Sequence, residues 1–197
     1  MFKNILKIVF LGLIGFSALV YFTANKPKQI EANQNSEVLM TKEALPQSFE
    51  LVGNKNDVMK DELFKEGTKT LIVVGNHDSL VVVKELNNYF PLDIPFVMVA
   101  NISSAPWFVK KLFIPSKLEE LNKGSNIAMI YDFNGDTVHA LEVTNNEKTA
   151  FIAYILDENN GIRKIYEGSV KEGALDGSMS EEEKKEVLQP LFELINE

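Results

Sequence analysis

Three short apolar runs, each of strand length, constrain the fold of this chain more than any other feature. They are TLIVV at residues 70–74, FVMVA at 96–100 and IAMIY at 127–131. Runs of this length without polar alternation are typical of strands that are covered on both faces. The three runs therefore predict the centre of a sheet that lies between two layers of helices.

The segment at residues 79–89 comes after the first run and has helical spacing. Leu80, Val83 and Leu86 recur on one helical face, and Asp78 or Ser79 would be a suitable N-cap. The consecutive valines at 81–83 favour extended structure instead. A helix is expected here, and a strand is the alternative.

The remaining elements complete an α/β order. Residues 48–53 resemble a short strand, 59–65 one or two helical turns, and 105–113 with 117–121 a helical excursion. The turn DENNG separates runs at 149–156 and 162–166, which predicts a β-hairpin, and SEEE at 180–183 is a capping box that opens a last helix. Strands that alternate with helices and then pair in a hairpin predict an α/β fold with a mixed sheet.

The amino terminus has the residue pattern expected of an export signal. Lys3 and Lys7 precede a run at residues 8–22 that is apolar but for Ser17, and basic residues on this side favour translocation of the downstream chain. A cut after Ala24 would leave Phe22 at the third-last position, so an uncleaved anchor is expected, with a cleaved signal peptide or a buried core helix as alternatives. We therefore expect a signal anchor or signal peptide over 1–24, a flexible linker over 25–45 and one folded domain over 46–197.

Charge and cysteine content exclude several functions. The chain has a net charge of −8, and the five lysines and three glutamates of residues 1–45 leave −10 for the rest. Nucleic acid is an unsuitable partner because its binding depends on lysine and arginine. The chain has no cysteine, which excludes disulfides, thiolate catalysis and thiolate metal sites.

The tetrapeptide Gly75-Asn76-His77-Asp78 comes directly after the first apolar run and resembles a metal-binding signature of calcineurin-like phosphoesterases. That resemblance implies a hydrolase or metallophosphoesterase at this corner. The further histidines and aspartates of such a site have no counterpart here, since His139 is the only other histidine. We therefore expect no metal and no cofactor, and a polar turn in which Asp78 or Ser79 caps the next helix. Anion binding by backbone N–H groups at that helix start remains a further alternative.

Several segments together resemble the thioredoxin-like superfamily, in its TlpA and peroxiredoxin branch. They are FELVGNKNDV at 49–58, GTKTLIVV at 67–74, IAMIYDFNG at 127–135 and YILDENNGI at 154–162. The chain is most similar to the periplasmic YtfJ-type proteins, which lack the redox cysteines. The resemblance implies a thioredoxin-like three-layer fold, with a central mixed β-sheet flanked by helices, preceded here by an amino-terminal hydrophobic helix.

The same resemblance places the usual redox site at the helix after residues 70–74. Ser79 and Val82 stand at the cysteine spacing, and no proline occurs between Pro115 and Pro190, where the cis-proline of the family would precede the strand containing Tyr154. No catalytic residue is therefore transferred to this chain. The candidate binding corner at the degenerate redox position consists of Asn76, His77, Asp78 and Ser79.

A second candidate surface lies in the segment PWFVKKLF at residues 106–113. Trp107 and Phe108 are expected to pack on the sheet, and the alternative is an amphipathic interaction surface that includes Lys110 and Lys111. Taken together, we expect an exported, membrane-anchored domain that binds a protein partner in the cell envelope. Its location would be the bacterial inner membrane, single pass with the domain in the periplasm, or the periplasm after signal cleavage.

Overall fold

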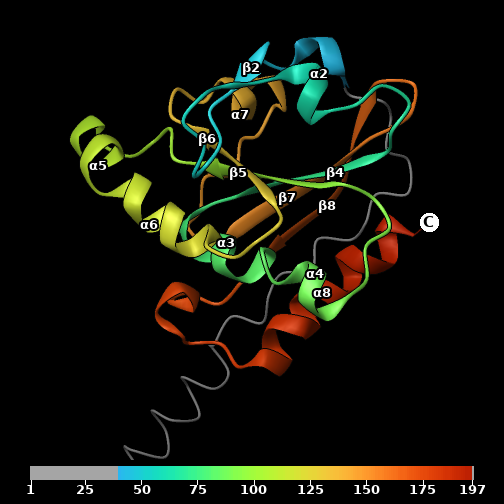
Figure 1. The fold of residues 1–197 in the computed structure, drawn as a ribbon. Helices are drawn as coiled ribbons and strands as arrows, with labels where there is room; N and C mark the ends of the chain where they lie inside the picture. The colour runs from blue at the N-terminus through green and yellow to red at the C-terminus, as the bar shows by residue number, and fades with distance from the viewer. Residues whose placement is uncertain (1–39, 197) are drawn as a thin grey trace, which may run out of the picture.

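The computed structural model describes residues 40–196, and its centre is one mixed sheet (Figure 1). The strands are β1 (Met40–Thr41), β2 (Ser48–Phe49), β3 (Val58–Met59), β4 (Thr70–Gly75), β5 (Phe96–Asn101), β6 (Ala128–Asp132), β7 (Ala150–Leu156) and β8 (Gly161–Ser169). Six of them form a sheet in the order β1-β8-β7-β4-β5-β6, and β2 pairs with β3. β4, β5 and β6 are parallel, whereas β7 is antiparallel to both β4 and β8. The predicted mixed sheet and its hairpin are confirmed.

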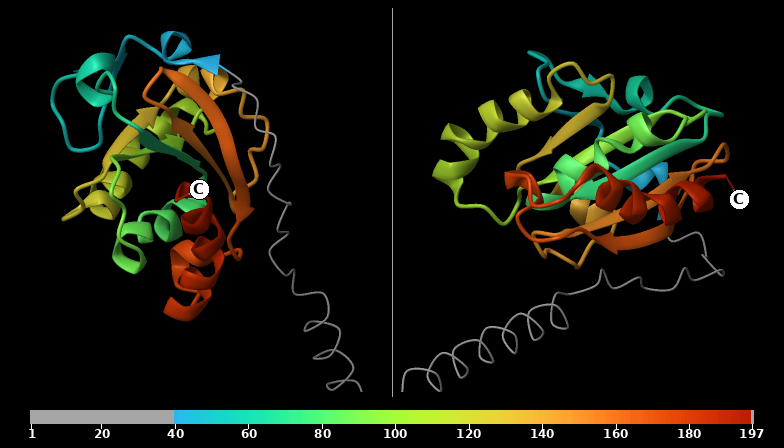
Figure 2. Two further views of the ribbon diagram at one scale, coloured as in Figure 1. Left: turned by 90° about the vertical axis from the view of Figure 1, so that its right-hand side faces the viewer. Right: turned by 90° about the horizontal axis from the view of Figure 1, so that it is seen from below.

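Helices cover both faces of this sheet. They are α2 (Lys60–Leu63), α3 (His77–Val83), α4 (Leu86–Tyr89), α5 (Trp107–Leu112), α6 (Ile114–Asn122), α7 (Asp136–Ala140) and α8 (Glu181–Ile195), with short 3₁₀ turns η1 (Lys42–Ala44) and η2 (Ala174–Asp176). Figures 1 and 2 show α3, α4 and α8 on one face and α2 and α7 on the other. The predicted three-layer arrangement is confirmed.

The apolar runs form strands because each of them supplies both layers of the core. Every residue of β4 is buried, and its side chains alternate between two hydrophobic clusters. Leu71 and Val73 face the cluster that α3, α4 and α8 cover, whereas Ile72 and Val74 face the cluster under α2 and α7. The two-residue period of a strand produces this division, so a central strand needs apolar residues at every position.

The helix expected after β4 forms, but it begins earlier than predicted. Asn76 has extended dihedral angles and is the N-cap, so α3 starts at His77 rather than after Asp78 or Ser79. Ser79 fills the third helical position, where its Oγ accepts a hydrogen bond from the Asn76 N–H at 2.8 Å. The helix is interrupted at residues 84–85, after which α4 begins. The strand alternative for this segment is wrong.

The last helix confirms the capping box read from the sequence. The Ser180 Oγ accepts from the Glu183 N–H at 3.2 Å, and the Glu183 carboxylate accepts from the Ser180 N–H at 2.7 Å. Two N–H groups that the first turn leaves without helical partners are thus satisfied.

The fold begins before the predicted end of the linker. Met40 pairs with Ile162 on β8, and Leu45 is buried in the core at 2% exposure. Residues 40–45 therefore belong to the domain, and the reason is tertiary, since a two-residue strand has no periodicity to detect. The segments expected as signal anchor (1–24) and as most of the linker (25–39) lie outside the described residues. Within residues 40–196, no helix is both long enough and apolar enough to cross a membrane.

Candidate functional site

The candidate corner lies where β4 passes into α3, beside the carboxyl end of β5. Parallel strands bring their carboxyl ends to one edge of the sheet, where open α/β sheets usually bind ligands. Asn76 comes directly after β4, and Asn101 ends the neighbouring strand. The approach is tight, because a side chain on Gly75 would place its Cβ 2.8 Å from a methyl carbon of Leu80. All four predicted corner residues are brought to this edge.

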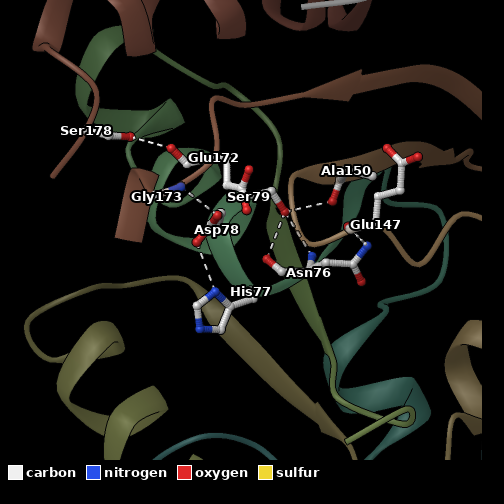
Figure 3. A network of polar contacts seen from close by, with 9 residues as sticks. All are labelled: Asn76, His77, Asp78, Ser79, Glu147, Ala150, Glu172, Gly173 and Ser178. Atoms are coloured by element: carbon white, nitrogen blue, oxygen red, sulfur yellow. Dashed lines mark hydrogen bonds and ion pairs between the residues drawn. The ribbon is translucent and has the colours of Figure 1, made fainter. Parts of the chain in front are cut away.

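The Ser79 hydroxyl is engaged in hydrogen bonds with backbone groups at this corner. Its side chain is fully buried, and its Oγ lies 2.9 Å from the Asn76 carbonyl and 2.8 Å from the Ala150 carbonyl (Figure 3). The same oxygen accepts from the Asn76 N–H. A hydroxyl held between backbone groups, with no base beside it, is not arranged as a nucleophile. It joins the start of α3 to the start of β7.

Asp78 is the second structural tie of the corner. Its side chain is 5% exposed and accepts from the Gly173 N–H at 2.9 Å, while its other oxygen lies 2.9 Å from the His77 Nδ1 (Figure 3). Gly173 immediately precedes η2, so the carboxylate connects α3 with a segment 95 residues away in sequence. A buried carboxylate of this kind needs such partners, because an unpaired charge in the core is costly.

His77 is the one corner side chain that reaches solvent, with an exposed fraction of 59%. The other histidine, His139, is exposed on α7, which packs on the opposite face of the sheet from α3. Within residues 40–196, no three histidine or carboxylate side chains are grouped closely enough to hold a metal ion. The geometry of the described residues therefore offers no support for the phosphoesterase or hydrolase alternative.

Asn101 and Asn146, which the sequence analysis did not identify as part of the site, form a hydrogen-bond network with Asn76. The Asn101 Nδ2 donates to the Asn76 Oδ1 and to the Asn146 Oδ1, both at 2.8 Å. The Asn76 Nδ2 in turn donates to the Glu147 carbonyl at 2.8 Å. The sequence offered one indication that Asn101 belongs to the site, because this residue comes directly after the apolar run at 96–100. The network fastens the loop before β7 to the carboxyl edge of the sheet.

That loop also occupies the start of α3. The Asp78 N–H donates to the Lys148 carbonyl at 2.9 Å, and the Asn76 N–H is taken by Ser79. The described residues contain no cis peptide bond, in agreement with the missing proline before β7. Anion binding at this helix start requires free N–H groups, and the Asp78 N–H in the first turn of α3 is already bonded to Lys148.

A buried carboxylate at the end of β6 is likewise committed to the fold. Asp132 pairs with Asn101 in the sheet and accepts from the N–H groups of Thr137 and Val138 at 3.1 and 2.8 Å. Burial raises the pKa of Asp132 above its usual range, although both hydrogen bonds oppose the shift. Its role is to hold the start of α7.

The second candidate surface is exposed, and the expectation that Trp107 or Phe108 packs on the sheet is wrong. No residue of α5 is buried. Leu118 of α6 is buried instead, so α6 holds the pair of helices to the domain while α5 extends beyond the sheet (Figure 1). We call the four large apolar side chains left in solvent the α5 surface: Trp107 (73% exposed), Phe108 (47%), Leu112 (69%) and Phe113 (57%).

Two hydrogen bonds attach the helix pair α5 and α6 to the domain. The Lys110 Nζ donates to the Phe133 carbonyl at 2.7 Å, and the Tyr131 hydroxyl donates to the Pro115 carbonyl at 3.1 Å. Burial raises the pKa of Tyr131 to about 12, so its hydroxyl remains a donor at neutral pH. Lys111 is exposed.

Comparison with known proteins reveals similarity in fold but not in sequence. No family model matches the chain, and no curated protein matches its sequence. Among solved structures, an uncharacterized conserved protein from Geobacillus kaustophilus shares 16% identity, with 87% of each chain covered and a TM-score of 0.50. A secreted disulfide oxidoreductase from Mycobacterium tuberculosis shares 13% identity, covering 78% of this chain and 97% of that one, with a TM-score of 0.43. Peroxiredoxin Q from Xanthomonas campestris shares 12% identity over 84% and 99%, with a TM-score of 0.41.

The sheet order and the helix positions decide the fold. A parallel β4-β5 pair, a helix directly after β4 and a β7-β8 hairpin beside β4 form the layers that the sequence resemblance implied. The narrower likeness to YtfJ-type proteins stays a prediction. The chain has an α/β fold of the thioredoxin-like kind.

Proposed function

We propose that this protein is an exported, membrane-anchored thioredoxin-like domain that acts without disulfide redox activity, as a binding or assembly factor for a protein partner in the cell envelope. Residues 1–24 would anchor it in the bacterial inner membrane by a single pass, with the domain in the periplasm. Cleavage of that segment would place the same domain free in the periplasm. The export signal of the sequence supports both versions.

The proposal rests mainly on the absence of cysteine and on the hydrogen bonds that engage Ser79 and Asp78 at the candidate corner. Thiol exchange needs an attacking thiolate and a resolving thiol, and the chain contains no cysteine. Ser79, at the position of the first cysteine, is buried and bonded to backbone groups, and Asp78 is bonded to the Gly173 N–H. The residues at the redox position of the fold therefore hold the fold together, which favours binding over catalysis.

The α5 surface supports a binding role. Large apolar side chains exposed on one short segment mark interaction sites, because leaving them in water has a free-energy cost. Trp107, Leu112 and Phe113 are each more than half exposed, and their helix adds nothing to the core.

The absence of cysteine makes the location directly testable, since any introduced cysteine is the only thiol in the chain. We expect Glu182→Cys, on the exposed start of α8, to react with a membrane-impermeant maleimide in intact spheroplasts. Lys3→Cys should react only after lysis if the anchor is retained, and should be missing from the mature protein if the segment is cleaved. Labelling of Glu182→Cys only after lysis would contradict export.

The binding role predicts a partner that depends on the folded domain. We expect a proximity-labelling enzyme fused to the carboxyl terminus of the full chain to label a reproducible set of envelope proteins. The matched control is the same enzyme fused directly after residue 39, which keeps the amino-terminal segment and removes the domain. If both fusions label the same proteins, the domain recruits no partner and the proposal fails.

A further inference from the structure

The charge around the α5 surface differs from that of the rest of the domain. Residues 104–118 contain Lys110, Lys111 and Lys117 and no acidic residue, whereas the whole chain has a net charge of −8. Lys111 and Lys117 are exposed, and Lys110 is half-buried beside the Phe133 carbonyl. Glu119 and Glu120 follow directly in α6, so the positive charge is confined to α5 and the start of α6. A basic segment of this kind on an acidic protein favours a negatively charged binding surface.

The geometry of α5 suits a flat, fluid surface. At roughly 100° per residue, Trp107, Phe108 and Leu112 fall within an arc of about 140°. Lys111 lies inside this arc, where its long side chain can extend sideways to place its ammonium group among polar head groups. Figures 1 and 2 show α5 reaching beyond the sheet, and Trp107, Phe108 and Leu112 are exposed.

The composition favours lipid over protein as the occupant. Helices that lie in a membrane interface combine Trp, Phe and Leu with lysine, and insert their apolar side chains to a shallow depth. The buried parts of protein interfaces are depleted of lysine. Each lysine near an anionic membrane contributes about 1 kcal/mol of attraction, and each large apolar side chain adds a hydrophobic contribution.

We propose that the α5 surface docks onto an anionic lipid bilayer through Trp107, Phe108 and Leu112, with Lys111 contacting lipid phosphates. The inference rests on the proposed function only for the location of the domain at a membrane. An anchor over residues 1–24 would leave 15 residues, 25–39, between the anchor and the sheet. Docking would then be intramolecular and would orient the domain on the membrane that carries it.

Trp107 is the only tryptophan, so its fluorescence reports on the α5 surface even in the full chain. The experiment uses full-length protein reconstituted into vesicles of phosphatidylcholine alone or with phosphatidylglycerol. In the anionic vesicles we expect Trp107 emission at shorter wavelength and quenching by brominated acyl chains. In the neutral vesicles, and in the anionic ones at about 1 M salt, where the screening length is near 3 Å, emission should resemble that of exposed tryptophan.

Charge variants separate this docking from unspecific attraction. Lys111→Gln should lower the ratio of docked to free Trp107 about fivefold. Lys110 is kept because its Nζ donates to the Phe133 carbonyl. The matched control is Lys55→Gln, which removes equal charge at an exposed site elsewhere and should leave the ratio unchanged.

Two outcomes would overturn the proposal. In the first, Trp107 shows the same emission and quenching in neutral and anionic vesicles, or in Lys111→Gln and its control Lys55→Gln. In the second, Trp107 is buried in native envelope membranes and exposed in every lipid vesicle, which would assign the surface to a protein partner. Neither outcome affects the labelling tests of export and partner recruitment, so the two proposals can fail separately.

Discussion

Replacing Tyr154 by alanine is expected to lower the free energy of unfolding by about 3 to 5 kcal/mol, the range for removing a large aromatic side chain from a core. Tyr154 is 2% exposed on β7 and packs in the cluster that α2 and α7 cover. Its hydroxyl donates to the Leu141 carbonyl at 2.8 Å. Burial raises the pKa of Tyr154, which keeps this hydroxyl protonated. Urea denaturation followed by circular dichroism would measure the loss.

Tyr154→Phe is the matched control because it keeps the ring and removes the hydrogen bond. We expect it to cost about 1 to 2 kcal/mol, since the buried Leu141 carbonyl loses its donor. The difference between the two variants isolates the packing contribution of the ring. Equal losses for both variants would show that the cluster adjusts to fill the cavity, contrary to the prediction.

Replacing Asp78 by alanine should lower the free energy of unfolding by about 2 to 3 kcal/mol. The change removes a charge-assisted hydrogen bond and leaves the Gly173 N–H without its acceptor. That hydrogen bond joins α3 to the segment that precedes η2 (Figure 3), so the two segments lose a direct connection. Thermal and urea denaturation would both report the loss.

His77→Ala is the control for Asp78→Ala at the same corner. The His77 side chain is mostly exposed and its ring pairs with its neighbour Asp78, so its removal should change stability by about 0.5 kcal/mol or less. If the corner residues serve to hold the fold together, the loss of unfolding free energy should be large at Asp78 and small at its neighbour His77. A loss at His77 as large as that at Asp78 would show that the imidazole itself supports the fold.

The central strands could be predicted from the sequence because their burial is visible in consecutive residues. FVMVA is apolar at every position and TLIVV at every position except Thr70, and β4 and β5 are buried at every position. The capping box at Ser180 is equally local, since its two hydrogen bonds join residues three apart. The start of α3 is harder to place because Asn76, Asp78 and Ser79 are all suitable N-caps.

The candidate site could be located but its hydrogen bonds could not be foreseen. The Ser79 contact with Ala150 joins residues 71 apart, and the Asp78 contact with Gly173 joins residues 95 apart. Nothing local marks such pairs. The same holds for Trp107, whose helix is predictable while its direction depends on Leu118 of α6 occupying the core instead.

By itself, the sequence determined that this protein has no thiol chemistry, because a chain without cysteine can supply neither an attacking nor a resolving sulfur. It also determined the order of the three central strands, α3, the β7-β8 hairpin and α8, since periodicity and caps are local properties. The tertiary structure alone decided that the polar corner is closed by its own contacts and that α5 leaves its apolar side chains in solvent. Both depend on which distant segments meet when the core packs, and packing is a property of the whole chain.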